Sequence, residues 1–208
     1  MHLTQSHLVR TFFCVTIAAA STLVVAAQHP THAADAAYRF MRTVTNKLQA
    51  AQRKPGFADR ATGFTHVVKN YAHLGRIGHK ALGDYKHKLK KKLRNQYYTG
   101  MASWIGYYAA GEAPKFPIKR VLLSPNAIRE GSYHIVNSQI QLVSGKNYNV
   151  RWVLTPSNRS FKVVEVQLDI GLGLANITPY LRDIFVRHIE ENNESVTNLV
   201  TALAKFNR

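Results

Sequence analysis

Two kinds of hydrophobic spacing follow one another along the chain, and their order limits the folds open to it. In the first part, apolar residues recur at intervals of three and four, as they do on one face of an α-helix. This spacing predicts helices over residues 36–51, 64–74 and 81–110. One side of the third predicted helix is apolar and aromatic: Leu82, Tyr85, Leu89, Leu93, Tyr97, Met101, Trp104, Ile105 and Tyr108.

The second part of the chain has the residue pattern of β-strands. β-Branched and aromatic residues, with much alternation, fill 116–123, 132–143, 148–154 and 161–170, and short turn-forming sequences separate these segments. Four consecutive strands with short turns predict an antiparallel meander. A helical segment over 179–206 closes the chain. We therefore expect an α+β fold, in which the N-terminal helices and a C-terminal helical tail pack on one face of a four-stranded antiparallel sheet.

Residues 1–27 have the layout of a secretory signal. Residues 1–11 carry one arginine and no acid, and residues 12–27, FFCVTIAAASTLVVAA, are largely apolar and end in small residues. A membrane-spanning helix needs roughly 20 apolar residues, and this block is shorter. We expect cleavage after Ala27, or as late as 33/34, with a retained anchor as the alternative, and one domain over 35–208. The single cysteine, Cys14, lies in the signal, so the mature chain has no thiol for a disulfide, a metal or catalysis.

The chain is strongly basic, with 28 Lys and Arg against 11 Asp and Glu and a formal net charge of +17. Outside the cytoplasm, such a charge favours anionic lipid, a polyanionic envelope or an acidic protein partner. Nucleic acid is disfavoured as a partner, because the tyrosines and Trp104 fall on the apolar side of the predicted helix, whereas stacking platforms mix aromatic and cationic side chains on one surface.

The charge is densest in residues 86–98, KHKLKKKLRNQYY. Leu89 and Leu93 are spaced four apart, which predicts an amphipathic helix with lysines on its other face. That face is either an ordinary solvated surface or a surface that docks on a partner or an anionic membrane. The candidate docking residues are Lys86, Lys88, Lys90, Lys91, Lys92 and Arg94.

Motifs for catalysis or metal binding are missing from the sequence. HExxH and GxSxG do not occur, the histidines form no close pair with a carboxylate, and the acids are few and scattered. GLG at 171–173 lacks the third glycine and the βαβ context of a dinucleotide loop. We therefore expect no enzyme activity, no metal site and no cofactor.

The third predicted helix and the predicted strands contain more large aromatic and aliphatic residues than polar residues suited to chemistry. A curved sheet covered by helices can leave its interior incompletely filled, which would make a cavity for lipid or another apolar ligand. Periodicity alone favours the alternative, an ordinary filled core.

Two segments resemble the periplasmic MlaC-type, or toluene-tolerance, family of phospholipid-binding proteins. Residues 161–206, FKVVEVQLDIGLGLANITPYLRDIFVRHIEENNESVTNLVTALAKF, are similar to the end of that family, where a strand xxVxDVxVEGxS leads into a helix with RxxFxxxI and a closing leucine-rich helix. The matching positions are Val163, Val164, Glu165, Val166, Asp169, Arg182, Phe185, Leu199 and Leu203. KALGDY, residues 80–85, resembles the family's ALGxYW.

The chain departs from the family pattern at three places. Lys86 stands where the family has an aromatic residue, the lysine run replaces TPxQ, and Ile170 replaces a glycine, with Gly171 next. We expect the docking surface and the turn after the last strand to differ accordingly.

The resemblance implies a soluble periplasmic carrier that moves glycerophospholipid between the inner and outer membranes as its cargo. It would dock on the substrate-binding ring protein of an ABC transporter at one membrane and on a lipoprotein complex at the other. A hopanoid-associated relative and a secreted basic interaction protein without ligand are the alternatives. The expected lipid-contacting residues are Leu82, Tyr85, Tyr97, Met101, Trp104 and Tyr108 from the third helix, with Val121, Ile135, Ile140, Trp152, Val164, Val166 and Leu168 from the sheet.

Overall fold

The computed structural model describes residues 32–169, 171 and 173–207. The predicted signal at 1–27, with Cys14, lies outside these residues, as does Ile170. Within them, helices come first, a sheet follows and helices close the chain, in the order that the two hydrophobic spacings predict.

The first two helices form where the apolar pattern predicts them. α1 (His32–Gln52) buries a stripe that includes Met41 and Val44, and α2 (Phe57–Tyr71) follows after the Lys-Pro-Gly turn. Immediately after α2, the backbone N–H of His73 donates to the carbonyl of Val163 at 2.8 Å. This bond ties the end of α2 to the sheet.

The prediction of one helix over 81–110 is wrong in its first part. The chain forms α3 (Leu74–Leu82), the 3₁₀ turns η1 (Gly83–Lys88) and η2 (Lys91–Leu93), and then α4 (Arg94–Glu112) and η3 (Ala113–Lys115). The physical reason lies at Gly83, whose φ of 53° is left-handed and ends α3.

The basic run is therefore two short turns and the start of α4, and not an amphipathic helix. Neighbouring cations on one helical face repel each other, and Lys90 is extended, with ψ 140°. Leu89 is still only 3% exposed, while the lysines around it face solvent. The predicted separation of buried leucine from exposed lysines is therefore present, although the segment is not an α-helix.

The sheet contains the predicted meander and two short strands that the sequence analysis missed. Its strands are β1 (Ile118–Leu123), β2 (Ile128–Glu130), β3 (Tyr133–Leu142), β4 (Asn147–Ser157), β5 (Ser160–Asp169) and β6 (Leu174–Asn176). The pairings between these six strands are antiparallel, in the order β1-β3-β4-β5-β6 with β2 beside β3. β2 and β6 have three residues each, which is too short for alternation to be recognised.

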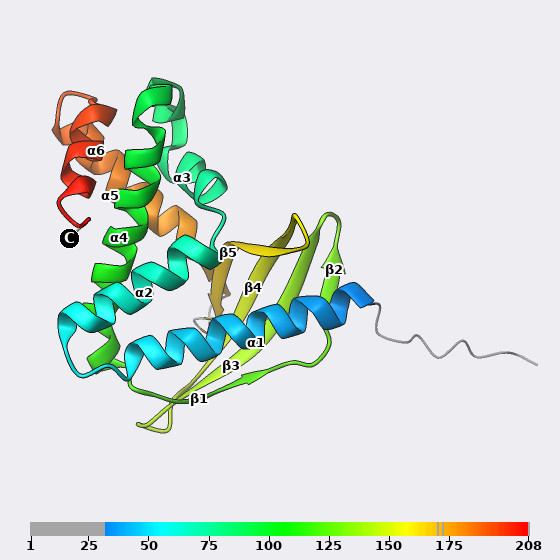
Figure 1. Cartoon of the computed structure of the whole chain (residues 1–208). Coiled ribbons are helices and arrows are strands. Elements are labelled where there is room, and N and C mark those ends of the chain that lie inside the picture. The colour runs from blue at the N-terminus through cyan, green and yellow to red at the C-terminus, as the bar shows by residue number, and fades with distance from the viewer. Residues whose placement is uncertain (1–31, 170, 172, 208) are drawn as a thin grey trace, which may run out of the picture.

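Helices cover the sheet unevenly (Figure 1). α1 lies across one face, in contact with β1, β3 and β5, while α2 to α6 gather into a helical part beyond β5. α5 (Ile177–Glu191) and α6 (Val196–Ala204) are the C-terminal tail. α2, α3 and α5 reach the sheet through β5.

This arrangement gives the molecule two main hydrophobic clusters. One joins α1 to the sheet around Met41, Val136 and Leu154, and the other lies inside the helical part around Tyr97, Met101 and Phe185. The boundary between them runs along β5.

Candidate functional site

An almost entirely apolar cavity of about 250 Å³, here called the seam cavity, lies where the two hydrophobic clusters meet. Five helices and two strands contribute to its wall. Its lining includes Val44 and Leu48 from α1, Val67 and Tyr71 from α2, Ile77 from α3, Ile105 from α4, Trp152 and Val166 from the sheet, and Ile177 and Leu181 from α5.

The helical lining follows from sequence spacing. Val44 and Leu48 are four residues apart on α1, as are Val67 and Tyr71 on α2, so each pair lies on one helical face. Each helix therefore presents two apolar side chains to the same space.

Trp152 forms a rigid wall of the seam cavity. Its indole N–H donates to the hydroxyl of Ser138 at 2.9 Å, across a β3–β4 pair in which Trp152 faces Val136. Because the polar atom of the ring is satisfied on the strand side, the ring offers the cavity an apolar surface.

Polar groups enter the wall at one place, where Glu165 of β5 meets the start of α5. The Glu165 carboxylate accepts from the backbone N–H of Thr178 and from that of Val166, each at 3.0 Å. Glu165 and Thr178 also line a second hollow of about 630 Å³ beside the seam cavity, here called the polar hollow because several charged side chains stand around it. The two spaces therefore share a wall at the β5–α5 contact.

Only two of the predicted lipid-contacting residues, Trp152 and Val166, line the seam cavity. Val164 lines the polar hollow instead. Ile135, which is 2% exposed, immediately precedes Val136 on β3. Since successive strand residues point to opposite faces and Val136 packs in the cluster with α1, Ile135 points to the sheet face opposite α1.

The other predicted sheet residues lie on the α1 side. Ile140 and Leu168 pack against the cluster that joins α1 to the sheet. Val121 of β1 pairs with Ile140 of β3 and is half-buried.

Three of the predicted lipid-contacting residues in the helical part are packed in its core and do not line the seam cavity. Leu82, Tyr97 and Met101 are 0% exposed in the helical cluster, and the Tyr97 hydroxyl donates to the carbonyl of Gly78 at 2.9 Å. Burial, with a smaller contribution from Tyr98, raises the pKa of Tyr97.

The remaining predicted residues of this part lie at its surface. Tyr85 packs against the helical cluster with the Lys88 ammonium 4.9 Å from its ring centroid. Trp104 stacks on Tyr108 at 5.7 Å, and the Tyr108 hydroxyl lies 3.3 Å from that of Tyr180 on α5. That hydrogen bond, more than partial burial, raises the pKa of Tyr108 to about 12.

Sequence reasoning missed most of the cavity lining. Periodicity predicts helices over the segments that hold Val44, Leu48, Val67, Tyr71 and Leu181, but it does not say which apolar faces of those helices meet. Ile177 starts α5, two residues before the predicted helical segment.

The candidate docking residues lie on η1, on η2, at Lys90 between these two turns and at the first residue of α4, and all of them are exposed. Lys88 forms an ion pair, because its Nζ lies 2.7 Å from a carboxylate oxygen of Glu194. The hydrogen bond from Lys88 lowers the pKa of the Glu194 carboxyl. The docking role of this set remains a prediction.

In the part of the chain that the structure describes, no three His, Cys, Asp or Glu side chains are grouped so as to hold a metal ion. None of the helices described there is long and apolar enough to cross a membrane.

The sequence matches no family model and no curated protein sequence. Five solved chains match by structure. One is the phospholipid-binding protein from Ralstonia solanacearum, solved in complex with a phospholipid. It covers 82% of this chain and 96% of its own, with a TM-score of 0.61 and 15% identity. The likeness confirms the predicted α+β fold.

Proposed function

We propose that this protein is a periplasmic carrier of glycerophospholipid. The observation that carries the proposal is the seam cavity, an apolar space at the boundary between two separate hydrophobic clusters. The fold shared with a protein solved with bound phospholipid supports the choice of ligand.

A carrier of this kind works by removing acyl chains from water. Each buried methylene group contributes roughly 0.8 kcal/mol, so two acyl chains do not cross an aqueous space unaided at useful rates. A protein cavity that holds the chains lowers this barrier without covalent chemistry.

The volume of the seam cavity implies that it widens on loading. Its 250 Å³ lies just below the range of about 300–1,000 Å³ typical of small-molecule pockets. The helical part has its own core around Tyr97 and Phe185, so a shift of this part away from the sheet would leave that core packed. We propose that the lipid-loaded form is more open along this boundary.

Partners follow from the same proposal. A soluble carrier must exchange lipid at both membranes, and the resemblance favours the ring protein of an ABC transporter at the inner membrane and a lipoprotein complex at the outer one. The exposed cations of residues 86–94 are the surface that we propose for docking on an acidic partner or for transient contact with anionic membrane.

A second candidate function is a secreted interaction protein without ligand. It is favoured by the filled helical core, in which Leu82, Tyr97 and Met101 are fully buried, and by the small volume of the seam cavity.

Native mass spectrometry of the protein purified from a bacterial periplasm without detergent distinguishes the two functions. We expect a stoichiometric adduct with the mass of a glycerophospholipid. A mass without ligand that persists after incubation with liposomes would support the interaction protein and contradict the carrier. A hopanoid mass would reassign the cargo.

A pair of variants tests the location of the lipid. Ile105→Trp puts a larger side chain into the seam cavity, whereas Ile128→Trp adds the same ring at a position that is 47% exposed on β2. We expect only Ile105→Trp to lose the lipid adduct while both variants keep the wild-type circular dichroism spectrum. Equal lipid content in both would place the lipid elsewhere.

A further inference from the structure

The polar hollow adjoins the seam cavity at Glu165 and Thr178. A glycerophospholipid has apolar chains joined to a charged headgroup, so chains held in an apolar space require a polar surface at its edge. The hollow is a space of about 630 Å³ beside that cavity, in which charged side chains of α3, η1 and α5 stand around a partly apolar wall from the sheet.

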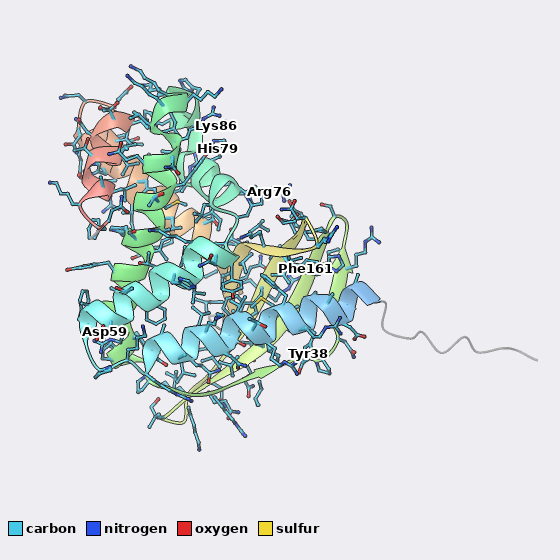
Figure 2. The ribbon with its side chains drawn as sticks, in the orientation of Figure 1. Tyr38, Asp59, Arg76, His79, Lys86 and Phe161 are labelled. Carbon is cyan, nitrogen blue, oxygen red and sulfur yellow. The ribbon has the colours of Figure 1, made fainter. Side chains whose placement is uncertain are left out.

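Cations face this hollow from three elements. Lys80 lies on α3, Lys86 on η1 and Arg182 on α5, with His79 beside them. Figure 2 labels His79 and Lys86 on the helical part and Arg76 of α3 nearer the sheet, where its guanidinium carbon lies 5.6 Å from the ring centroid of Tyr133.

The two acids of the hollow already have partners. Glu165 accepts two backbone N–H groups, and Asp84 lies 3.7 Å from the Arg182 guanidinium. Within residues 32–169, 171 and 173–207, Lys80 and Lys86 have no carboxylate at ion-pair distance. Two cations of the hollow are thus available to an anion.

Gly83 allows Arg182 to reach the hollow. A Cβ at position 83 would stand 2.6 Å from Arg182 Nε, so the absence of a side chain lets the guanidinium cross the turn between α3 and η1. The guanidinium can bind a phosphate with two parallel hydrogen bonds, and the lysines add point charges.

We propose that the polar hollow binds the phosphodiester of an anionic lipid headgroup, and that the carrier therefore prefers phosphatidylglycerol, with its net negative charge, to zwitterionic phosphatidylethanolamine. The ammonium of the latter would meet Lys80 and Lys86, which repel it. This inference rests on the proposed carrier function and adds the charge class of its cargo.

The test is a competition between two lipids for the lipid-free protein. Vesicles contain equal amounts of phosphatidylglycerol and phosphatidylethanolamine with the same acyl chains, and native mass spectrometry gives the ratio of the two adducts. We expect phosphatidylglycerol to exceed phosphatidylethanolamine about tenfold, a modest difference for charge-assisted hydrogen bonds.

The variant Lys80→Gln/Lys86→Gln tests the assignment to the hollow. The matched control is Lys119→Gln/Lys146→Gln, which removes the same charge from exposed lysines outside it. We expect the first variant to bring the adduct ratio close to one and the control to keep the wild-type ratio. A wild-type ratio near one, or equal ratios in the two variants, would overturn the proposal and leave the carrier function standing. Loading of neither lipid would contradict both.

A free phosphate ester is the other source of the same chemistry. Glycerol 3-phosphate added in excess should compete with phosphatidylglycerol and show no binding to protein already loaded with that lipid. Binding to loaded and lipid-free protein alike would make the hollow a site for a soluble phosphate ester and overturn the headgroup assignment.

Discussion

Glu165 on β5 holds the first turn of α5, because its carboxylate accepts the backbone N–H of Thr178 at 3.0 Å. Asn176, the residue that caps this helix, makes no side-chain capping bond, so Glu165 supplies the capping acceptor from another element. It also places a negative charge at the positive end of the helix dipole. The contact joins the helical part to the sheet at the place where the seam cavity and the polar hollow meet.

Replacing Glu165 by alanine removes both the acceptor and the charge. We expect the free energy of unfolding to fall by about 1 kcal/mol, the usual loss for a helix cap, as measured by urea unfolding followed by circular dichroism. Glu190→Ala, an exposed acid later on α5, is the control and should change stability by less than about 0.5 kcal/mol. Equal losses in the two variants would show that Glu165 does not cap α5.

Gly83 and Gly131 provide a matched pair for testing the approach of Arg182. Both have a positive φ, 53° and 58°, so alanine at either position should cost at least about 1–2 kcal/mol in backbone strain. Only at Gly83 does an added Cβ meet Arg182, and nothing lies within 4 Å of one at Gly131. We expect both variants to lose stability, Gly83→Ala more than Gly131→Ala, whereas only Gly83→Ala lowers the ratio of anionic to zwitterionic lipid in the competition. An unchanged ratio would mean that Arg182 does not hold the headgroup.

The order and type of the main elements could be predicted from the sequence because they depend on local spacing. The three- and four-residue intervals give α1 and α2, and the β-branched segments give β1, β3, β4 and β5. The helix break at 83–93 was missed because apolar residues continue through it at helical intervals. The signal for the break was Gly83 itself, whose left-handed φ ends α3.

The site was harder to predict than the fold because its wall is assembled from distant parts of the chain. Trp152 and Val166 were expected on chemical grounds, and both line the seam cavity. Tyr97 and Met101 had the same apolar character but face the interior of the helical part. Tertiary packing decides whether an apolar face contacts a neighbouring element or a cavity, and sequence periodicity does not predict that packing.

Tyr97 tests whether the helical core is as complete as its burial indicates. The side chain is 0% exposed and its hydroxyl donates to the Gly78 carbonyl, so Tyr97→Phe leaves a buried carbonyl without that partner. We expect a loss of about 1–2 kcal/mol in the free energy of unfolding, measured by urea titration. Tyr107→Phe, at a side chain that is 50% exposed, should be nearly neutral. A neutral Tyr97→Phe would indicate that water reaches Gly78 and that this core is open.

His134 should make stability depend on pH. It is 9% exposed on β3, with its ring 5.0 Å from that of Phe161, and burial, with a smaller contribution from the Arg129 charge, lowers its pKa below the ordinary value. The unfolded chain therefore binds more protons once the pH falls below about 6.5. The stability that this group contributes is complete above that pH and declines as the pH falls toward the lowered pKa.

Urea unfolding at a series of pH values should show a smaller decline in stability for His134→Phe than for wild type. His87→Gln, at an exposed histidine of η1, is the control and should keep the wild-type decline. The same decline in all three proteins would assign the pH dependence to other groups.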